Sequence, residues 1–331
     1  MPQLRQNIIT GEWVVFAPER AKRPSDYISI ASERKQSKKD CPFCVDSGRS
    51  EFPNRLDNCD SKSNYIIKNK FPAFLEEPDL SSKRYLIEDE FFAMKPAIGG
   101  HDVVVIKDHE QSLPRFTEGI WEDLFESFMC RYKHYAKIPN VEYVMPIYNH
   151  GPQAAASIEH PHAQIFASAV VPNIVARELT HTAQYHSEHK TCAFCDLIAH
   201  EKSQNTRVLF ENDDFIAFTF YAARFPFEIW IMPKKHSSDF YAMNEEQTKL
   251  LAEITKKVFS RLDETLNDPS VNFFLHSAPV NDDNKLEYYH WHLEVAPRLA
   301  LYGGYELGSG MIIDIIAPEQ AAEYLRLGAR S

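Results

Sequence analysis

The stretch His160-Pro161-His162-Ala163-Gln164 stands immediately before the apolar run Ile165-Phe166-Ala167. Because side chains alternate between the two faces of an extended chain, those at positions 160, 162 and 164 are expected on one face. An unpartnered buried polar group costs about 1–3 kcal/mol, so two imidazoles and a carboxamide in register need partners. A lone histidine would be interpreted as a hydrogen-bonded core residue, whereas three polar groups in register favour a functional site.

The chain has 331 residues, which is long enough for two domains or for one duplicated unit. Its formal net charge of -11 argues against a surface that coats nucleic acid, because such a surface needs clustered Lys and Arg. The longest apolar runs, such as 103–106, are too short to span a bilayer, and no cleavable signal is evident at the N-terminus. These features predict a cytoplasmic protein that binds neither nucleic acid nor a membrane.

The cysteines divide into two groups. Four of the six form Cys-x-x-Cys pairs, Cys41/Cys44 and Cys192/Cys195, which in a reducing compartment are typical of metal ligands or redox dithiols. Cys59 and Cys130 have no obvious partner, and we interpret them as small buried or surface residues. Six cysteines are too few for a secreted disulfide framework in a chain of this length.

The second half of the chain repeats the order of the first. Cys192-Ala193-Phe194-Cys195 matches Cys41-Pro42-Phe43-Cys44, and the apolar run that ends at His236 matches the one that ends at His109. The segment 208–215 is interpreted as the counterpart of the strand that precedes Asn69 and Phe71.

The repeat continues through a helix into the histidine motif. Amphipathic helices are predicted within 115–137 and at 245–266, and His290-Trp291-His292 stands where His160-Pro161-His162 stood. Ordered correspondences with similar spacing favour an internal duplication, with one half at 1–180 and the other at 181–331.

Each half therefore offers two thiolates and two imidazoles, the donor set of tetrahedral zinc. Because four protein ligands fill the coordination shell, both sites are expected to be structural rather than catalytic. The residues leave open whether zinc occupies both sites or iron occupies one. The predicted ligands are Cys41, Cys44, His109 and His160 in the first half, and Cys192, Cys195, His236 and His290 in the second.

His162 is not a metal ligand in this scheme. With one ring nitrogen tied to a backbone carbonyl, a neutral imidazole presents the other nitrogen as a nucleophile that can carry a phosphoryl or nucleotidyl group. Gln164 on the same face could donate to a non-bridging phosphate oxygen as charge shifts in the transition state. The small residues 154–157 fit either a loop whose N–H groups meet phosphate or a plain tight turn, with equal weight.

The His-x-His motif in the second half of the chain is expected to be catalytically inactive. His292 is the counterpart of His162, but Glu294 stands where Gln164 would be, and a carboxylate repels phosphate. Glu178, His276 and His292 could form a further metal cluster. We favour hydrogen-bonded core histidines, because the second zinc site already has four ligands.

A compact basic cluster, Arg20-Ala21-Lys22-Arg23-Pro24, lies in this otherwise acidic chain. It is either a solvated loop or an anion clamp, since arginines suit bidentate phosphate contacts.

The His-x-His-x-Gln strand, the doubled arrangement and the Arg-Ala-Lys-Arg-Pro segment together resemble the galactose-1-phosphate uridylyltransferase family of the histidine triad superfamily. The similarity extends from Gly11 to Glu306. It implies an α+β fold in which duplicated histidine-triad-like halves form an antiparallel half-barrel sheet flanked by helices, usually as a homodimer. It also implies double-displacement chemistry, in which a nucleotide sugar gives its nucleoside monophosphate to His162, releases sugar 1-phosphate, and a second acceptor then takes the nucleotidyl group.

The resemblance also implies the substrate contacts. Asn69 and Phe71 would contact the nucleoside, and Asn149, Ser157 and Gln164 would hold the α-phosphate. Arg20 and Arg23 would face the phosphates or the sugar. Tyr305 and Glu306 resemble the sugar-contacting pair that the neighbouring subunit lends in this family.

Two branches of the family fit the sequence. The predicted acceptor is a hexose 1-phosphate, as in UDP-glucose:hexose-1-phosphate uridylyltransferases. The second Cys-x-x-Cys pair with His236, and the segments 225–231 and 303–308, look more like the plant ADP-glucose phosphorylase branch, whose acceptor is inorganic phosphate. A histidine-triad hydrolase that passes the nucleotidyl group to water, and a non-enzymatic zinc-scaffold interaction module, are the remaining alternatives.

Overall fold

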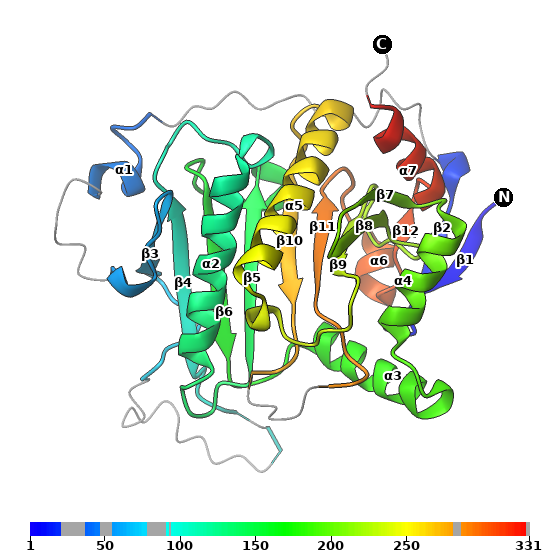
Figure 1. Ribbon diagram of the computed structural model, residues 1–331, viewed down its shortest axis with the longest axis horizontal. Helices are drawn as coiled ribbons and strands as arrows, with labels where there is room; N and C mark the ends of the chain where they lie inside the picture. Colours follow the sequence, from blue (N-terminus) through cyan, green and yellow to red (C-terminus); the bar gives the residue numbers. More distant parts are fainter. Residues whose placement is uncertain (21–36, 47–54, 78–90, 93, 281–285, 329–331) are drawn as a thin grey trace.

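A nine-stranded antiparallel sheet with helices on both faces forms the body of the protein, and a separate three-stranded sheet lies beside it (Figure 1). The structure is a computed structural model, and it describes residues 1–20, 37–46, 55–77, 91–92, 94–280 and 286–328. The architecture is the predicted α+β class. The large sheet is open, because β3 and β7 remain as its two edges.

The order of the large sheet is β3-β4-β6-β5-β10-β11-β9-β8-β7, and every pair of neighbouring strands is antiparallel. In that order the strands are Asn64–Lys68, Gly99–Ile106, His162–Ser168, Tyr143–His150, Val271–His276, His292–Pro297, Ile229–Pro233, Phe215–Thr219 and Val208–Glu211.

The strand order is mirrored about the β5–β10 pair. β4, β6 and β5 on one side correspond to β9, β11 and β10 on the other, and β8 occupies the place of β3. The register agrees, because Asn64 of β3 pairs with Ile106 of β4 while Phe215 of β8 pairs with Pro233 of β9. The prediction that segment 208–215 corresponds to β3 is therefore wrong by one strand. The counterpart of β3 is β8, and β7 is an additional edge strand.

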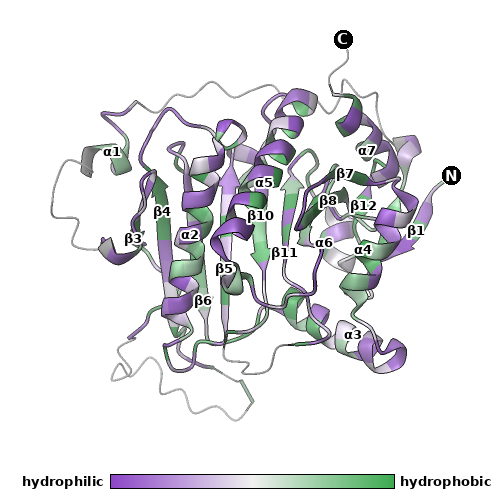
Figure 2. Ribbon diagram, viewed as in Figure 1, coloured by the Kyte–Doolittle hydropathy of each residue, from purple (hydrophilic) through white to green (hydrophobic). Residues whose placement is uncertain are grey.

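Helices α2 (Glu118–Tyr135) and α5 (Glu245–Leu266) lie side by side across one face of the sheet and fall within the predicted ranges (Figure 1). The side chain of Thr117 caps α2 by accepting from the backbone N–H of Ile120, and Asn244 opens α5 in a capping box. Apolar and polar residues alternate along both helices (Figure 2). Their apolar sides cover alternate strand residues that include Val104 and Ile165, and this layer is the main core.

Shorter helices cover the opposite face: α1 (Pro42–Asp46), α3 (Asn173–His189) and α4 (Ala193–Gln204). Phe43 of α1 packs there on Val103 and Val105, and Phe194 of α4 belongs to a second small core with Trp230. Because Ala163 and Ile165 of β6 are in the core beneath α2 and α5, His162 and Gln164 point to the α1 face.

The two ends of the described chain meet at the small sheet, whose order is β1-β2-β12 (Figure 1). Its strands are Gln3–Gln6, Trp13–Phe16 and Ile313–Asp314, and the C-terminal helices are α6 (Gly304–Ser309) and α7 (Pro318–Leu327). Arg5 of β1 bonds both carboxylate oxygens of Glu319 at 3.0 Å and so ties the ends together. Among the described helices, none has both the length and the apolar character required to cross a lipid bilayer.

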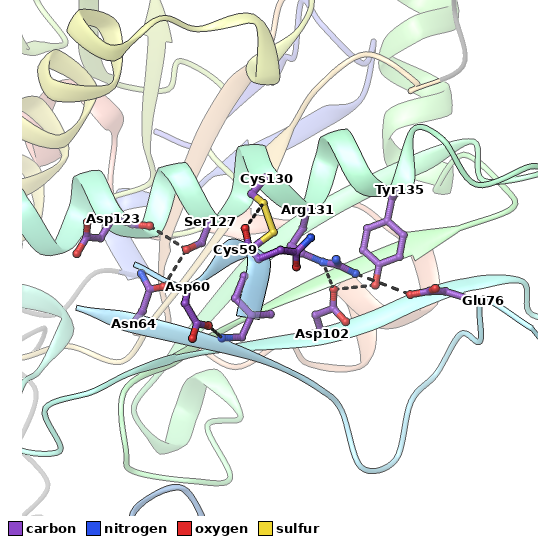
Figure 3. Close-up of a disulfide and its surroundings, with 12 residues drawn as sticks. Cys59, Asp60, Asn64, Glu76, Asp102, Asp123, Ser127, Cys130, Arg131 and Tyr135 are labelled. Carbon is purple, nitrogen blue, oxygen red and sulfur yellow. Dashed lines mark hydrogen bonds and ion pairs between the residues drawn. A yellow bond between two sulfur atoms is a disulfide. The ribbon is translucent and has the colours of Figure 1, made fainter. Parts of the chain in front are cut away.

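A disulfide joins Cys59 to Cys130, whose Cα atoms lie 5.9 Å apart (Figure 3). Cys59 ends a short 3-10 helix, η3 (Asp57–Cys59), that leads into β3, and Cys130 lies on α2. The interpretation of these cysteines as residues without a partner is therefore wrong. They are 71 positions apart in the sequence, and only the packing of α2 against the segment before β3 brings them together.

A buried ion pair close to the disulfide anchors the middle of β4 to α2 (Figure 3). Asp102 Oδ2 accepts from Arg131 Nε at 2.6 Å and from the Tyr135 hydroxyl at 2.7 Å, and the Asp102 and Arg131 side chains are each 1% exposed. Gly100 is required beside this pair, because an added Cβ would lie 2.1 Å from the Tyr135 oxygen. Since Asp102 points towards α2, its neighbour His101 points to the opposite face.

Candidate active site and metal centres

His162 opens β6 as a buried, neutral imidazole with one nitrogen committed. Its Nδ1 lies 2.8 Å from the carbonyl oxygen of His160, so Nδ1–H donates and the lone pair is on Nε2. Burial lowers the pKa of His162 and outweighs the opposing effect of that hydrogen bond. The residue is 8% exposed, and Nε2 has no hydrogen-bond partner within the described part of the chain. The ring therefore carries an unprotonated Nε2 atom, which is the state that nucleophilic attack would require.

Phe43 holds the two histidines of the motif in place. Its ring lies 5.5 Å from the His160 ring and 5.3 Å from the His162 ring, edge-on to both. Both histidines therefore face α1, as the alternation of the extended chain predicts. Phe194, between the second pair of cysteines, lies 6.1 and 5.2 Å from the rings of His290 and His292, but it is tilted rather than edge-on to them.

Gln164 lies on the same face as His162 and is held by a residue of the neighbouring strand. Its Oε1 is 2.8 Å from His101 Nε2, and His101 Nε2 is also 3.1 Å from Asn69 Nδ2. Asn69 Oδ1 accepts from the backbone N–H of Phe71, whose side chain is 80% exposed. The structure thus brings the predicted nucleoside contacts and Gln164 into one connected group through His101.

Asn149 reaches the site from β5. Tyr148 pairs with Ala163, so the next residue, Asn149, lies beside His162 on the α1 face. Asn272 of β10 donates from Nδ2 to Asn149 Oδ1 at 2.8 Å and to the Ala154 carbonyl at 2.9 Å. Asn272 therefore links the strand that carries Asn149 to the loop that follows it.

The loop of small residues after β5 is a tight turn. The backbone N–H groups of Ala154, Ala155 and Ala156 donate to carbonyls of Gly151 and Pro152 within the turn. They are not available to a phosphate, so of the two interpretations of this run the tight turn is correct. Ser157 follows as an exposed residue.

The ligand atoms of the first predicted metal site lie close together, next to the start of β6. Cys44 Sγ lies 3.2 Å from His109 Nδ1 and 3.4 Å from His160 Nδ1, and the two Nδ1 atoms are 3.0 Å apart. The ligand atoms of Cys41, Cys44, His109 and His160 all lie within 4.8 Å of one another. His160 Nε2 donates to the Ile106 carbonyl at 2.5 Å, which leaves the Nδ1 lone pair directed at the sulfurs. Two thiols and two oriented imidazoles fit a tetrahedral metal ion.

The second predicted set converges in the same way. The ligand atoms of Cys192, Cys195, His236 and His290 lie within 4.8 Å of one another. His290 Nε2 donates to the Pro233 carbonyl at 2.8 Å and His236 Nε2 to the Leu286 carbonyl at 3.1 Å, so both Nδ1 atoms face the sulfurs. This site is closer to the surface, because His236 is exposed whereas His109 is buried.

A third group surrounds His292: Glu178, His276, His292 and Glu294, all buried, have ligand atoms within 4.8 Å. Its carboxylates already have protein partners. Glu294 forms an ion pair with Arg224, and Glu178 accepts from His276 Nδ1 at 3.0 Å and from the Tyr289 hydroxyl at 2.8 Å. Burial opposes a charge on His276, but the carboxylates outweigh it and raise the pKa of His276. His292 Nδ1 lies 3.1 Å from the His290 carbonyl oxygen. These bonds favour the interpretation of His276 and His292 as hydrogen-bonded core residues.

Two family profiles, described as galactose-1-phosphate uridyl transferase N-terminal domain and C-terminal domain, match residues 1–172 and 178–329. The chain belongs to this family. The family and the names of the relatives indicate a nucleotidyltransferase, as the sequence predicted.

Relatives in the galactose-1-phosphate uridyl transferase family align along nearly the whole chain. The ADP-glucose phosphorylase of Arabidopsis thaliana is 31% identical over 338 residues, covering 98% of this chain and 92% of the relative. The galactose-1-phosphate uridylyltransferase of Thermotoga maritima is 28% identical over 335 residues, covering 98% of each. A crystal structure of the Arabidopsis ADP-glucose phosphorylase with bound ADP-glucose superposes with a TM-score of 0.82 at 28% identity and covers 100% of both chains.

The other predicted substrate contacts of this family member are Arg20, Arg23, Tyr305 and Glu306. Arg20 ends a 3-10 helix, η1 (Pro18–Arg20), and Arg23 lies outside the described residues. Tyr305 and Glu306 lie on α6, which is well separated from β6 (Figure 1). Tyr305 is 52% exposed, and Glu306 accepts from the Gly303 N–H at 2.9 Å.

The sequence alone did not identify three residues as members of the site: Phe43, His101 and Asn272. Phe43 recurs as Phe194 in the second Cys-x-x-Cys pair, which is a signal that the repeat contained. His101 lies at an alternate position to Val103 and Val105, on the strand next to β6, but strand order was needed to use that fact. Asn272 gave no local signal, because the two site residues to which it donates, Asn149 and Ala154, are more than 100 positions away.

Proposed function

We propose that this protein moves a nucleoside monophosphate from a nucleotide sugar to a hexose 1-phosphate through a covalent nucleotidyl-His162 intermediate, as a UDP-glucose:hexose-1-phosphate uridylyltransferase does. The observation that carries the proposal is the arrangement of His162. Its Nδ1–H is bonded to a backbone carbonyl, burial keeps the ring neutral, and Gln164 stands beside it on the same face.

In the first half-reaction, the Nε2 lone pair of His162 attacks the α-phosphorus. The P–Nε2 bond forms as the bond from phosphorus to the bridging oxygen breaks, and sugar 1-phosphate leaves with that electron pair. The imidazole becomes cationic, and the His160 carbonyl 2.8 Å from Nδ1 stabilises this charge. In the second half-reaction, a phosphate oxygen of the acceptor attacks the same phosphorus and the neutral imidazole leaves.

Zinc is the metal that both cysteine–histidine sets suit, and we assign it a structural role. Cys41, Cys44, His109 and His160 would hold one ion and Cys192, Cys195, His236 and His290 the other, with iron the alternative in one site. When bound, the first ion cross-links α1, the end of β4 and the start of β6. This fixes His160, and with it the carbonyl that orients His162.

The substrate contacts follow the same scheme. Asn69 and the exposed Phe71 would hold the nucleoside, with the phenyl ring available for stacking on a base. Asn149, Ser157 and Gln164 would hold the α-phosphate, and Arg20 and Arg23 the phosphates or the sugar. We infer that Tyr305 and Glu306 reach the sugar from a second subunit, because α6 lies at the other end of the sheet from His162 (Figure 1). A cytoplasmic homodimer of chains, each with halves at 1–180 and 181–331, completes the proposal.

A second candidate function is ADP-glucose phosphorolysis, in which inorganic phosphate replaces the hexose 1-phosphate. The 31% identity and the TM-score of 0.82 to the Arabidopsis ADP-glucose phosphorylase support it. UDP-glucose, UDP-galactose and ADP-glucose, each offered with hexose 1-phosphate or with phosphate, separate the two candidates. Turnover of ADP-glucose only with phosphate would favour the phosphorylase, and turnover of a UDP-sugar only with hexose 1-phosphate would favour the uridylyltransferase.

The covalent step is tested by trapping. Protein incubated with nucleotide sugar labelled in the nucleoside should yield an acid-labile adduct of about one equivalent, and His162→Ala should yield none. His189→Ala, which changes an exposed histidine of α3, is the control and should label like wild type. Equal labelling of His162→Ala would refute the mechanism. Continued turnover without any acceptor would identify a hydrolase, and absence of nucleotide binding by calorimetry would favour a zinc scaffold.

A further inference from the structure

His101 is the one histidine on β4, and each of its ring nitrogens contacts a defined polar group. The backbone N–H of Ala73 points at Nδ1 at 3.3 Å, and Gln164 Oε1 lies 2.8 Å from Nε2. The ring stacks on Phe166 with centroids 4.0 Å apart, and the residue is 8% exposed. Buried polar contacts of this number define both the position and the hydrogen-bonding state of the ring.

The backbone donor determines the tautomer. An N–H can only donate, so Nδ1 must offer a lone pair to Ala73, and the proton of the neutral ring is then on Nε2. The opposite tautomer would place two N–H groups face to face between His101 and Ala73. Burial lowers the pKa of His101 despite the opposing effect of Gln164, so the ring stays neutral. Two side chains contact Nε2, Asn69 through Nδ2 at 3.1 Å and Gln164 through Oε1 at 2.8 Å. An amide nitrogen cannot accept, so Gln164 Oε1 is the acceptor of the Nε2–H group.

This donor determines which end of the Gln164 carboxamide faces the substrate. An Nε2–H of His101 requires the oxygen of Gln164 as its partner, so the amide nitrogen must point away from His101. Gln164 Nε2 makes no hydrogen bond to another described residue, and it lies on the His162 face of β6. A carboxamide rotated by half a turn would present its oxygen there and repel a phosphate.

We propose that His101 is a positioning residue for nucleotidyl transfer: it locks the Gln164 carboxamide so that the NH₂ group donates to a non-bridging oxygen of the α-phosphate. This inference rests on the proposed function. The ring is itself held, because its neighbour Asp102 is anchored to Arg131 and Tyr135 of α2 (Figure 3). In the second half, Glu228 lies one residue before β9 and corresponds to His101, and no such lock is present among its described contacts.

Three substitutions at position 101 distinguish the effect of the hydrogen bond to Gln164 from the effect of the size of the ring. His101→Gln can place an amide N–H where Nε2 stood, because the two atoms are the same number of bonds from Cβ. His101→Asn is too short for this and can replace only Nδ1. His101→Phe keeps the stacking on Phe166 but has no donor. His189→Gln on the exposed part of α3 is the matched control.

The readout is the single-turnover rate of nucleotidyl-enzyme formation with the two diastereomers of UDP-glucose or ADP-glucose that carry sulfur on the α-phosphate. Because sulfur is a poor acceptor, wild type should prefer the diastereomer that leaves oxygen facing Gln164. His101→Phe and His101→Asn should form adduct about 10–100-fold more slowly with the normal substrate, at little change in KM, and should lose most of the diastereomer preference. His101→Gln should retain the preference and lose less than about 3-fold in rate.

The outcomes are distinguishable. If His101→Phe or His101→Asn slows both diastereomers equally, the role of His101 is merely structural and the inference is overturned. Equal preference in His101→Gln and His101→Asn would overturn it too. If wild type forms no adduct with any of these substrates, the proposed function itself fails and the inference falls with it.

Discussion

Removal of the Cys59–Cys130 disulfide should lower the stability of the whole chain by a predictable amount. The bond closes a loop of 71 positions that contains β3, β4 and most of α2. Loop-closure entropy for a chain of that length corresponds to about 4 kcal/mol at 25 °C, and measured effects of native disulfides are typically about 2–4 kcal/mol. We therefore expect Cys59→Ala/Cys130→Ala to lose about 2–4 kcal/mol in free energy of unfolding.

Urea unfolding at saturating zinc, with and without the reductant TCEP, measures this loss. Wild type should fall to the stability of the double variant when TCEP is added, whereas the double variant should not change. The second comparison controls for any effect of the reductant on the four cysteines of the metal sets. The single variant Cys59→Ala should behave like the double variant, because either change removes the bond.

Two results would refute the reasoning. The first is a wild-type transition that TCEP does not move. The second is alkylation of six cysteines rather than four when the protein is denatured without reductant, which would show that Cys59 and Cys130 are thiols. Because disulfides are rare in reducing compartments, the same alkylation performed on freshly lysed cells would also test the proposed cytoplasmic location.

The lowered pKa of His162 means that the proposed nucleophile stays unprotonated as the pH falls. The rate of adduct formation should therefore be flat from neutral pH down through 6.5 and decline only below it, and a single-turnover pH profile with an apparent pKa at or above 6.5 would contradict this. Asp102→Ala leaves Arg131 buried without its carboxylate partner and should lower the free energy of unfolding, measured by urea denaturation, by about 3–5 kcal/mol. A loss below about 1 kcal/mol would show that the pair is not effectively buried. Elemental analysis should find about two zinc ions per chain, and the Cys44→Ser variant should contain about one. The variant should also form the nucleotidyl adduct more slowly. An undiminished zinc content in Cys44→Ser would show that Cys44 is not a ligand.

The features that the sequence predicted are those encoded by short motifs that occur twice. A Cys-x-x-Cys pair, a histidine after an apolar run and a His-x-His strand each lie within a few residues, and their repetition made chance unlikely as an explanation. The helical periodicity of apolar residues extends over enough residues in α2 and α5 for both helices to be predicted, and both lie within the predicted ranges. The structure brings both ligand sets together because β4 and β6, like β9 and β11, are neighbours in the sheet.

The features that the sequence did not predict depend on which strands are adjacent. Cys59 meets Cys130 only because α2 crosses the segment before β3, and no spacing rule connects the two positions. His101 meets Gln164 only because β4 pairs with β6 in a register that sets Val103 opposite Gln164. The small residues 154–157 could not be assigned from composition, since the same run suits a phosphate loop and a tight turn, and only the hydrogen bonds distinguish them.

The two halves differ around the second histidine of each His-x-His motif, and this difference supports the proposal that only His162 acts as a nucleophile. Val103 stands opposite Gln164 on β4, and the equivalent register position on β9, opposite Glu294, is Trp230. The indole stacks on His292 at 4.5 Å with planes 15° apart, and the ring that corresponds to His162 is 0% exposed. Glu294 is also committed to Arg224, and although burial works against its ionisation, this guanidinium and the nearby histidines lower the pKa of Glu294 to about 2. We therefore expect that Glu294→Gln would not by itself make His292 reactive, because the indole of Trp230 would still cover the ring.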